Sequence, residues 1–146
     1  MAWSETSRGF GNDSGSSTTT VSTGAGLGTP QNVAAVTGQP IIGGYACASG
    51  GTVTGVTDTV GNTYTILTPE TTFGPTSVIF YCASSIGTNA ANVVTATVSA
   101  ATTFKSIAVV TGTGLDTGAG FFITQQTGFA SAASVSPTNP LACGSL

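Results

Sequence analysis

The chain has 146 residues, of which 40% are hydrophobic and only 5% are charged, and its formal net charge is −3. This length suits one domain with a single core, and the hydrophobic content excludes a disordered chain, which combines low hydrophobicity with high net charge. Two basic residues cannot neutralise a nucleic-acid backbone and no apolar run approaches the ~18 residues of a membrane span, so neither partner is expected.

Residues 1–20 predict an extended N-terminal arm that stands apart from the domain. Gly and Ser dominate this stretch, and Trp3 and Phe10 are its large apolar side chains. Small polar residues bury too little surface to offset the entropy of ordering a backbone, about 1–2 kcal/mol per residue. We therefore expect a neighbouring subunit to hold the arm through Trp3 and Phe10. The alternative is an arm that folds back on its own domain.

Residues 21–146 are predicted to form a β-sandwich domain. β-rich runs recur along the chain between Gly, Pro and Asn breaks, and no window keeps a helical period beyond two turns. The run at 104–111 is the most apolar, so we expect it to be central. The expected strands are 18–23, 33–36, 39–48, 53–58, 63–67, 77–83, 93–99, 104–111, 121–126 and one near 141–143. This pattern favours an all-β, two-sheet antiparallel sandwich of immunoglobulin-like or jelly-roll type.

The stretch 53–67 is predicted to be a hairpin, two strands joined by a polar turn. Asp58 is expected to accept backbone N–H groups of the turn, as the side chain of an Asx turn does. Gly61 can adopt positive φ without steric cost, and Asn62 tolerates it. We favour this turn-forming role for the three residues over calcium or sugar binding. Tyr64 is expected to point inward from the second strand.

Residues 56–65 read Val-Thr-Asp-Thr-Val-Gly-Asn-Thr-Tyr-Thr and resemble the signature Val-Thr-Asp-x-x-Gly-Asn-x-Tyr-Thr. That signature recurs in β-sandwich modules of phage virion proteins and of large bacterial surface proteins. The resemblance covers about residues 38–114, and its further matching stretches are 78–83, 95–99 and 107–110. It implies a sandwich scaffold and no particular activity. Such modules usually belong to longer chains and continue beyond the strand near 140–144, so an open sheet edge is expected as a docking site.

The sequence contains no recognisable catalytic constellation. It has no His, which removes the usual base of a catalytic triad. Lys105 lies in a predicted strand, where we expect its side chain to face outward. Asp58, Glu70 and Asp116 form no carboxylate motif, and the Asp-Thr-Gly at 116–118 is interpreted as a loop. We therefore predict a protein that is not an enzyme and that needs no cofactor or metal.

The three cysteines are an odd number at unrelated spacings. Cys47 and Cys82 lie in apolar strand patterns, and we expect them to be small buried thiols. The N-terminus begins with Met and lacks the basic start and apolar stretch of a secretory signal, so synthesis in the cytoplasm is expected. A reducing cytoplasm favours free thiols over a disulfide, which remains the alternative for Cys47, Cys82 and Cys143.

The expected function is that of a virion structural protein, most simply a phage capsid decoration or cement protein. Its partners would be other copies of itself and a major capsid or tail protein, contacted through the arm and the sheet edges. The candidate subunit contacts are Trp3, Phe10, Phe73 and Phe129. The alternatives are a carbohydrate-binding or adhesive module of a bacterial surface protein, and a phage tail, fibre or filament subunit. In the adhesive alternative Tyr64 or Phe73 would stack on a sugar.

Overall fold

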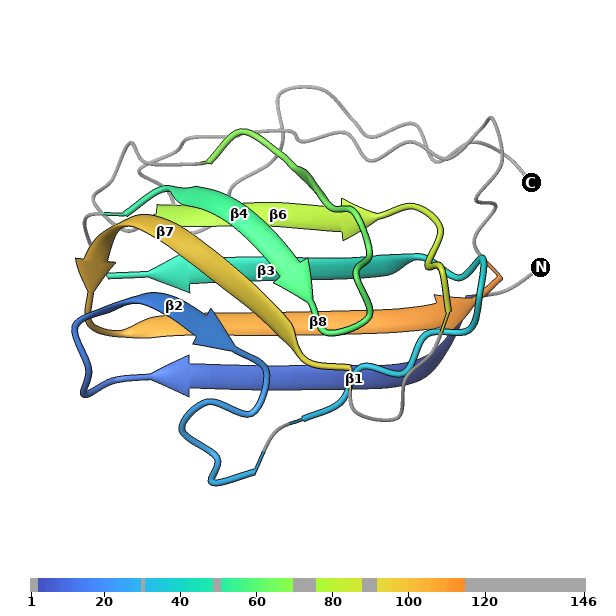
Figure 1. Cartoon of the computed structure of the whole chain (residues 1–146), viewed down its shortest axis with the longest axis horizontal. Coiled ribbons are helices and arrows are strands. Elements are labelled where there is room, and N and C mark those ends of the chain that lie inside the picture. Colours follow the sequence, from blue (N-terminus) through green and yellow to red (C-terminus); the bar gives the residue numbers. More distant parts are fainter. Residues whose placement is uncertain (1–2, 30, 49–50, 70–75, 88–91, 115–146) are drawn as a thin grey trace, which may run out of the picture.

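The computed structural model of the chain is an all-β protein built from two antiparallel sheets (Figure 1). It describes residues 3–29, 31–48, 51–69, 76–87 and 92–114. The strands are β1 (Ser4–Asp13), β2 (Thr18–Ser22), β3 (Ile41–Cys47), β4 (Val53–Asp58), β5 (Thr65–Ile66), β6 (Thr76–Cys82), β7 (Val94–Thr102) and β8 (Lys105–Thr113). One sheet has the order β1-β8-β3-β6-β5 and the other β2-β7-β4. The predicted all-β fold of two antiparallel sheets is confirmed.

The chain winds between the sheets as in a jelly roll. Antiparallel pairs join β1 to β8, β2 to β7 and β3 to β6. The first strand thus pairs with the last, the second with the second-last and the third with the third-last. Successive pairs fall in opposite sheets, and the β3–β8, β4–β7 and β5–β6 pairs complete the ladders. The first three pairs follow the winding of a jelly roll, whereas β5 departs from it by joining β6 in the five-stranded sheet and not β4. Of the two predicted sandwich types, the pairing selects this one.

A single core fills the space between the sheets. Inward residues alternate with outward ones along β3 and β6, as a half-buried strand requires. The largest buried apolar side chains of the five-stranded sheet include Phe80, Ile41 and Ile107. The three-stranded sheet contributes Val21, Val56, Val94, Ala96 and Val98. Gly43 pairs with Phe80, and a Cβ at Gly43 would collide with the ring, so core packing requires the glycine.

The extended arm predicted for residues 1–20 is not confirmed. Residues 4–13 form β1, which pairs with β8 at the edge of the five-stranded sheet. Ladder hydrogen bonds supply the stabilisation that the small side chains lack. Gly9 and Gly11 face inward, where a Cβ would press on Val33 and collide with the carbonyl of Ser22. The glycines of this segment therefore permit close packing, and they do not mark a flexible tail.

Two further strand predictions are wrong, and two are not covered by the structure. The hairpin predicted at 53–67 does not form, because β4 pairs with β7 and β5 with β6, in different sheets. Residues 33–36 are not a strand, although Val33 is buried in the core. The predicted strands 121–126 and 141–143 lie outside the described residues. The apolar run of β8 does lie inside its sheet, between β1 and β3.

Candidate functional site

The turn between β4 and β5 is built around the carboxylate of Asp58. Its Oδ1 accepts backbone N–H groups from Val60, Gly61 and Asn62 at 3.2, 2.7 and 2.9 Å. Gly61 has a φ of 94°, in the left-handed region that glycine occupies without a Cβ clash. The structure thus places Asp58, Gly61 and Asn62 in the predicted turn. This turn carries the chain from one sheet to the other, so it holds the two layers together.

Three side chains converge on the other oxygen of the Asp58 carboxylate. Oδ2 accepts from Asn62 Nδ2 at 2.7 Å, Tyr64 OH at 2.8 Å and Asn92 Nδ2 at 3.2 Å. Burial alone would raise the pKa of Asp58, but the hydrogen bonds from Asn62, Tyr64 and Gly61 outweigh it and hold the pKa below its usual value. Burial, with the bond to Asp58, raises the pKa of Tyr64. A carboxylate shared among so many donors of its own chain is a structural clamp.

Lys105 is buried, not outward as predicted. Its side chain follows the inward alternation of β8, and Nζ donates to the carbonyl of Ser16 at 3.1 Å and to that of Thr102. Nζ also lies 3.3 Å from Asp13 Oδ2. The pKa of Asp13 is lowered to about 2, mainly by the hydrogen bond from the backbone N–H of Ser16. Gly15 and Lys105 lower it further, and desolvation opposes them. The ammonium ties the β1–β2 turn to β8, so its role is structural.

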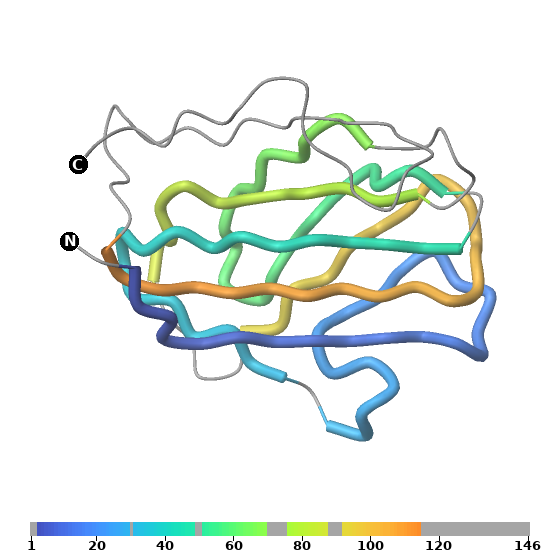
Figure 2. The backbone as a smooth tube through the Cα atoms, turned by 180° about the vertical axis from the view of Figure 1, so that it is seen from behind, coloured from blue at the N-terminus to red at the C-terminus, as the bar shows by residue number. Residues whose placement is uncertain are grey.

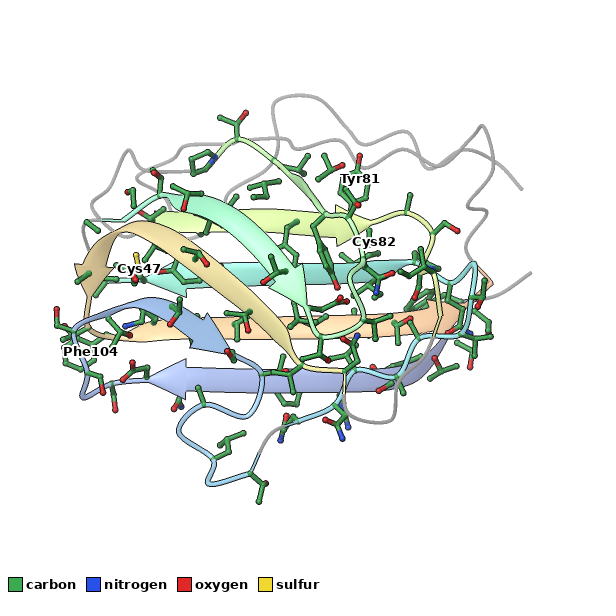
Figure 3. The ribbon with its side chains drawn as sticks, viewed as in Figure 1. Cys47, Tyr81, Cys82 and Phe104 are labelled. Atoms are coloured by element: carbon green, nitrogen blue, oxygen red, sulfur yellow. The ribbon has the colours of Figure 1, made fainter. Side chains whose placement is uncertain are left out.

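Cys47 and Cys82 are buried, as predicted, and Cys47 Sγ donates to the carbonyl of Gly51 at 3.7 Å. Figure 3 shows them at opposite ends of the five-stranded sheet, Cys47 at the end of β3 and Cys82 at the end of β6. This separation excludes a disulfide between the two in this fold. Burial is the main cause that raises the pKa of Cys82, which keeps the thiol protonated at neutral pH. Cys143 lies outside the described residues.

The outward side of the five-stranded sheet forms the candidate functional surface. In Figure 2 this sheet faces the viewer, and β2, β4 and β7 lie behind it. Strand register aligns its outward residues in three rows that each cross four strands. We call this surface the outer face; its rows are Asn12-Ser106-Ala46-Ser77, Phe10-Ala108-Gly44-Ile79 and Arg8-Val110-Ile42-Tyr81. Small and apolar residues dominate it.

The middle row of the outer face is large at both ends and small at its centre. Phe10 and Ile79 are 46% and 43% exposed, and Ala108 and Gly44 lie between them. The result is an open groove made of two adjoining hollows of about 540 and 520 Å³, both lined by these four residues. Trp3 lines the second hollow. The structure therefore brings Trp3 and Phe10, two of the predicted subunit contacts, to one groove.

The other predicted contacts and acids are not placed by the structure. Phe73, Phe129, Glu70 and Asp116 lie outside the described residues. Ile79 and Gly44 were not among the predicted contacts. The available signal was the strand 77–83, which carries apolar residues on both of its faces. One face of such a strand packs in the core, and the other must lie on the surface or under a partner.

Charge is sparse on this side of the molecule. In the described part of the chain, the outer face and its groove carry the charged side chains of Glu5 and Arg8. Arg8 Nε lies 3.5 Å from Glu5 Oε1, and the guanidinium lies 5.9 Å from the centre of the Phe10 ring. Both charged groups are largely exposed, so the pair adds little to stability. Its opposite charges leave the surface close to neutral.

The free edge of β1 is covered by the segment that follows β2. The backbone N–H of Phe10 donates to Gln31 Oε1 at 2.7 Å, and its carbonyl accepts from the N–H of Gly24 at 2.5 Å. The N–H of Asn12 donates to the carbonyl of Ala25 at 2.9 Å. These bonds occupy groups that an added strand would need. At residues 10 and 12 the β1 edge is therefore not open to an added strand.

A strained aromatic residue lies at the tip of the β7–β8 turn. Phe104 has a φ of 54°, which is unfavourable for a bulky side chain, and it is 62% exposed. Figure 3 shows Phe104 at one end of the molecule, on the turn that joins β7 to β8. It belongs to no row of the outer face. It therefore offers an exposed phenylalanine outside the groove, against which Phe10 can be compared.

No family model, curated protein or solved structure matches this chain. Among the described residues, no helix has the length and apolar character needed to cross a membrane. The same residues contain no group of three or more His, Cys, Asp or Glu side chains that could hold a metal ion. The candidate site is therefore defined by the geometry of the outer face.

Proposed function

We propose that this chain is a structural protein that acts by packing against other protein subunits. The observation that carries the proposal is the outer face, a groove with an apolar floor, two exposed apolar walls and almost no charge. Contiguous exposed apolar surface on a soluble domain is typical of a site that another protein covers. Scattered single apolar residues would not support the same inference.

The assembly that we propose is a phage virion, in which the chain serves as a capsid decoration protein made in the host cytoplasm. A major capsid or tail protein would be its partner. The signature at 56–65 supports this proposal, as does the jelly-roll winding, which is common among viral capsid domains. The second support is an analogy of fold only. The N-terminal segment does not contribute as an arm, because β1 belongs to the domain, so the outer face takes over the contact.

The proposal includes the absence of enzymatic activity and of a cofactor. Asp58 is held by the hydrogen bonds of its own turn, and Asp13 and Lys105 are tied to each other and to backbone groups. Glu5 and Arg8 form an exposed pair on the strand. Each of these groups has a structural partner and none is directed at a shared reaction centre.

A second candidate function is that of a carbohydrate-binding or adhesive module of a bacterial surface. Trp3 and Phe10 favour it, because exposed aromatic rings on a sheet face can stack on sugars, and lectins also use the jelly roll. Tyr64 is not available for this role, since its OH bonds to Asp58 and its ring packs on Phe80. The floor of small apolar residues offers few hydrogen-bond partners for sugar hydroxyls, so we favour a protein partner.

Immunogold electron microscopy with an antibody against this chain tests the proposal. We expect gold on icosahedral shells in gradient-purified particles from the source material, with the chain present at a fixed ratio to the major shell protein. Gold on tails or filaments would move the protein to another part of the virion. Purified particles that lack the chain, together with glycan binding that Trp3→Ala abolishes, would overturn the proposal in favour of the adhesive module.

A further inference from the structure

Gly44 lies on a central strand of the five-stranded sheet, yet its own fold does not require a glycine. Among the described residues, a Cβ at Gly44 would meet only the carbonyl oxygen of Val78 at 3.9 Å, an ordinary contact, and the φ of Gly44 is not positive. Its neighbour Gly43 is the opposite case, because the Phe80 ring occupies the place of its side chain. A glycine inside a strand weakens the strand and often marks the close approach of another molecule. The hollow above Gly44 is therefore a place where another molecule can approach the backbone closely.

The middle row of the outer face is complementary to itself. Phe10 forms a ridge, and Ala108 and Gly44 form the adjacent hollow on the next two strands. When two copies meet face to face about a two-fold axis parallel to the strands, the order of the row is reversed in the second copy. A shift of between one and two strands then brings each ridge over the opposite hollow. Such reciprocal contacts are the mark of a two-fold symmetric interface.

We infer that the outer face is the interface of a two-fold symmetric dimer of this chain, in which Phe10 of each copy fills the Ala108–Gly44 hollow of the other. The inference rests on the proposed function and names one of the subunits against which the chain packs. In this dimer the contact between subunits is made by stacked sheets, and not by the extended arm expected from the sequence.

The charge of the outer face fits a second copy, and its size fits a weak dimer. The shift leaves about two and a half strands facing the second copy; at about 4.8 Å per strand and nine residues of about 3.4 Å each, the contact is roughly 350 Å² per copy and roughly 700 Å² in total, the size of a weak or transient contact. Glu5 and Arg8 bring one negative and one positive charge from each copy, so no net charge is buried. The covered edge of β1 removes side-by-side strand pairing as a competing arrangement at that edge.

Analytical ultracentrifugation of the full chain tests the inference, at concentrations from about 1 µM to about 1 mM, which span the weak affinities expected for a small interface. We expect a reversible monomer–dimer equilibrium. Gly44→Leu fills the hollow and Phe10→Ser removes the ridge, and each change is expected to weaken the dimer by about 100-fold or more, because every dimer contains the contact twice. Phe104→Ser, the same change outside the face, is the matched control and should leave the equilibrium unchanged.

Disulfide trapping gives a second readout that does not depend on loss of affinity. In a Cys143→Ser background, Ala108→Cys places a thiol beside the expected axis, whereas Thr57→Cys places one on an exposed position of the other sheet. Oxidation should link two copies through the first position and not through the second. This variant also serves if Gly44→Leu fails to fold.

Two outcomes would overturn the inference. One is a wild-type chain that stays monomeric over the whole range, as expected if a capsid protein, a glycan or residues 115–146 of the same chain occupy the groove. The other is a dimer that Phe10→Ser and Gly44→Leu leave intact. A monomer that is nevertheless present at a fixed ratio in purified virions would refute the dimer and leave the proposed function standing. A dimer that is absent from virions would refute the proposed function and leave the dimer standing.

Discussion

Replacing Asp58 with alanine should remove the clamp that joins the two sheets. Two donors, the OH of the partly buried Tyr64 and the Nδ2 of the buried Asn62, would lose their acceptor, and each such loss costs about 1–3 kcal/mol. Asn92 Nδ2 keeps its bond to the carbonyl of Val33, and water can reach part of the turn backbone. Because the carboxylate is only partly buried, we take values near the low end and add about 1 kcal/mol for the turn. The expected loss is about 3–4 kcal/mol, a large share of a typical stability.

Urea unfolding at pH 7, followed by circular dichroism, measures this loss as a shift of the midpoint at constant slope. Tyr64→Phe removes a single donor and should cost only about 1 kcal/mol. Thr57→Ala, at an exposed position one residue before Asp58, is the matched control and should change stability by less than about 0.5 kcal/mol. A loss below about 1 kcal/mol for Asp58→Ala would refute the role of the carboxylate as a clamp.

The pH dependence of stability provides an independent check on Asp58. Its pKa in the folded chain is lower than the value of about 3.9 expected when the chain is unfolded. The stabilisation is therefore complete above that value and is lost as the pH falls through the lowered pKa. Asp13, whose pKa is lowered to about 2, acts in the same direction. Wild-type stability should fall below about pH 4, and the fall should be shallower in Asp58→Asn. Identical acid profiles would contradict the assignment.

Substitutions at four other positions have sharp expectations, all measurable by urea unfolding. Gly43→Ala should destabilise the fold by about 1–3 kcal/mol because the Phe80 ring blocks the new Cβ. Gly44→Ala should be neutral or slightly stabilising. Equal changes in stability for the two variants would contradict the β3–β6 register. Lys105→Ala should cost about 2–4 kcal/mol, and Lys105→Met less, since Met refills the space of the buried stem. Phe104→Gly should stabilise by about 0.5–1 kcal/mol through relief of its positive φ; a loss of similar size would argue against strain there.

Most strands could be predicted because their signal is local. β3, β6, β7 and β8 alternate apolar and other residues within a few positions, and that period is visible in any window. β1 has no such signal, since its stability comes from a ladder to β8, about a hundred residues away in sequence. Composition alone suggested a flexible arm. The turn at Asp58 could be predicted, but not that the strands on either side of it belong to different sheets.

Only part of the candidate site could be predicted from the sequence. Trp3 and Phe10 were identified as exposed aromatic contacts from their residue type, and the structure places both at the groove. The groove itself depends on the register of four strands, which aligns Phe10, Ala108, Gly44 and Ile79 in one row. No local pattern encodes that alignment. The inward direction of Lys105 was missed because an outward lysine is the usual case on a strand, and three loop and strand acceptors compensate for its burial.

Hydroxyl-radical footprinting of the full chain at low and high concentration tests most directly whether the outer face is a surface covered by another subunit. Modification of Phe10 should decrease as the concentration rises, while modification of Phe104 should stay the same, because only the first residue lies on the outer face. Equal modification of Phe10 at both concentrations, or protection of Phe104 in its place, would contradict this account.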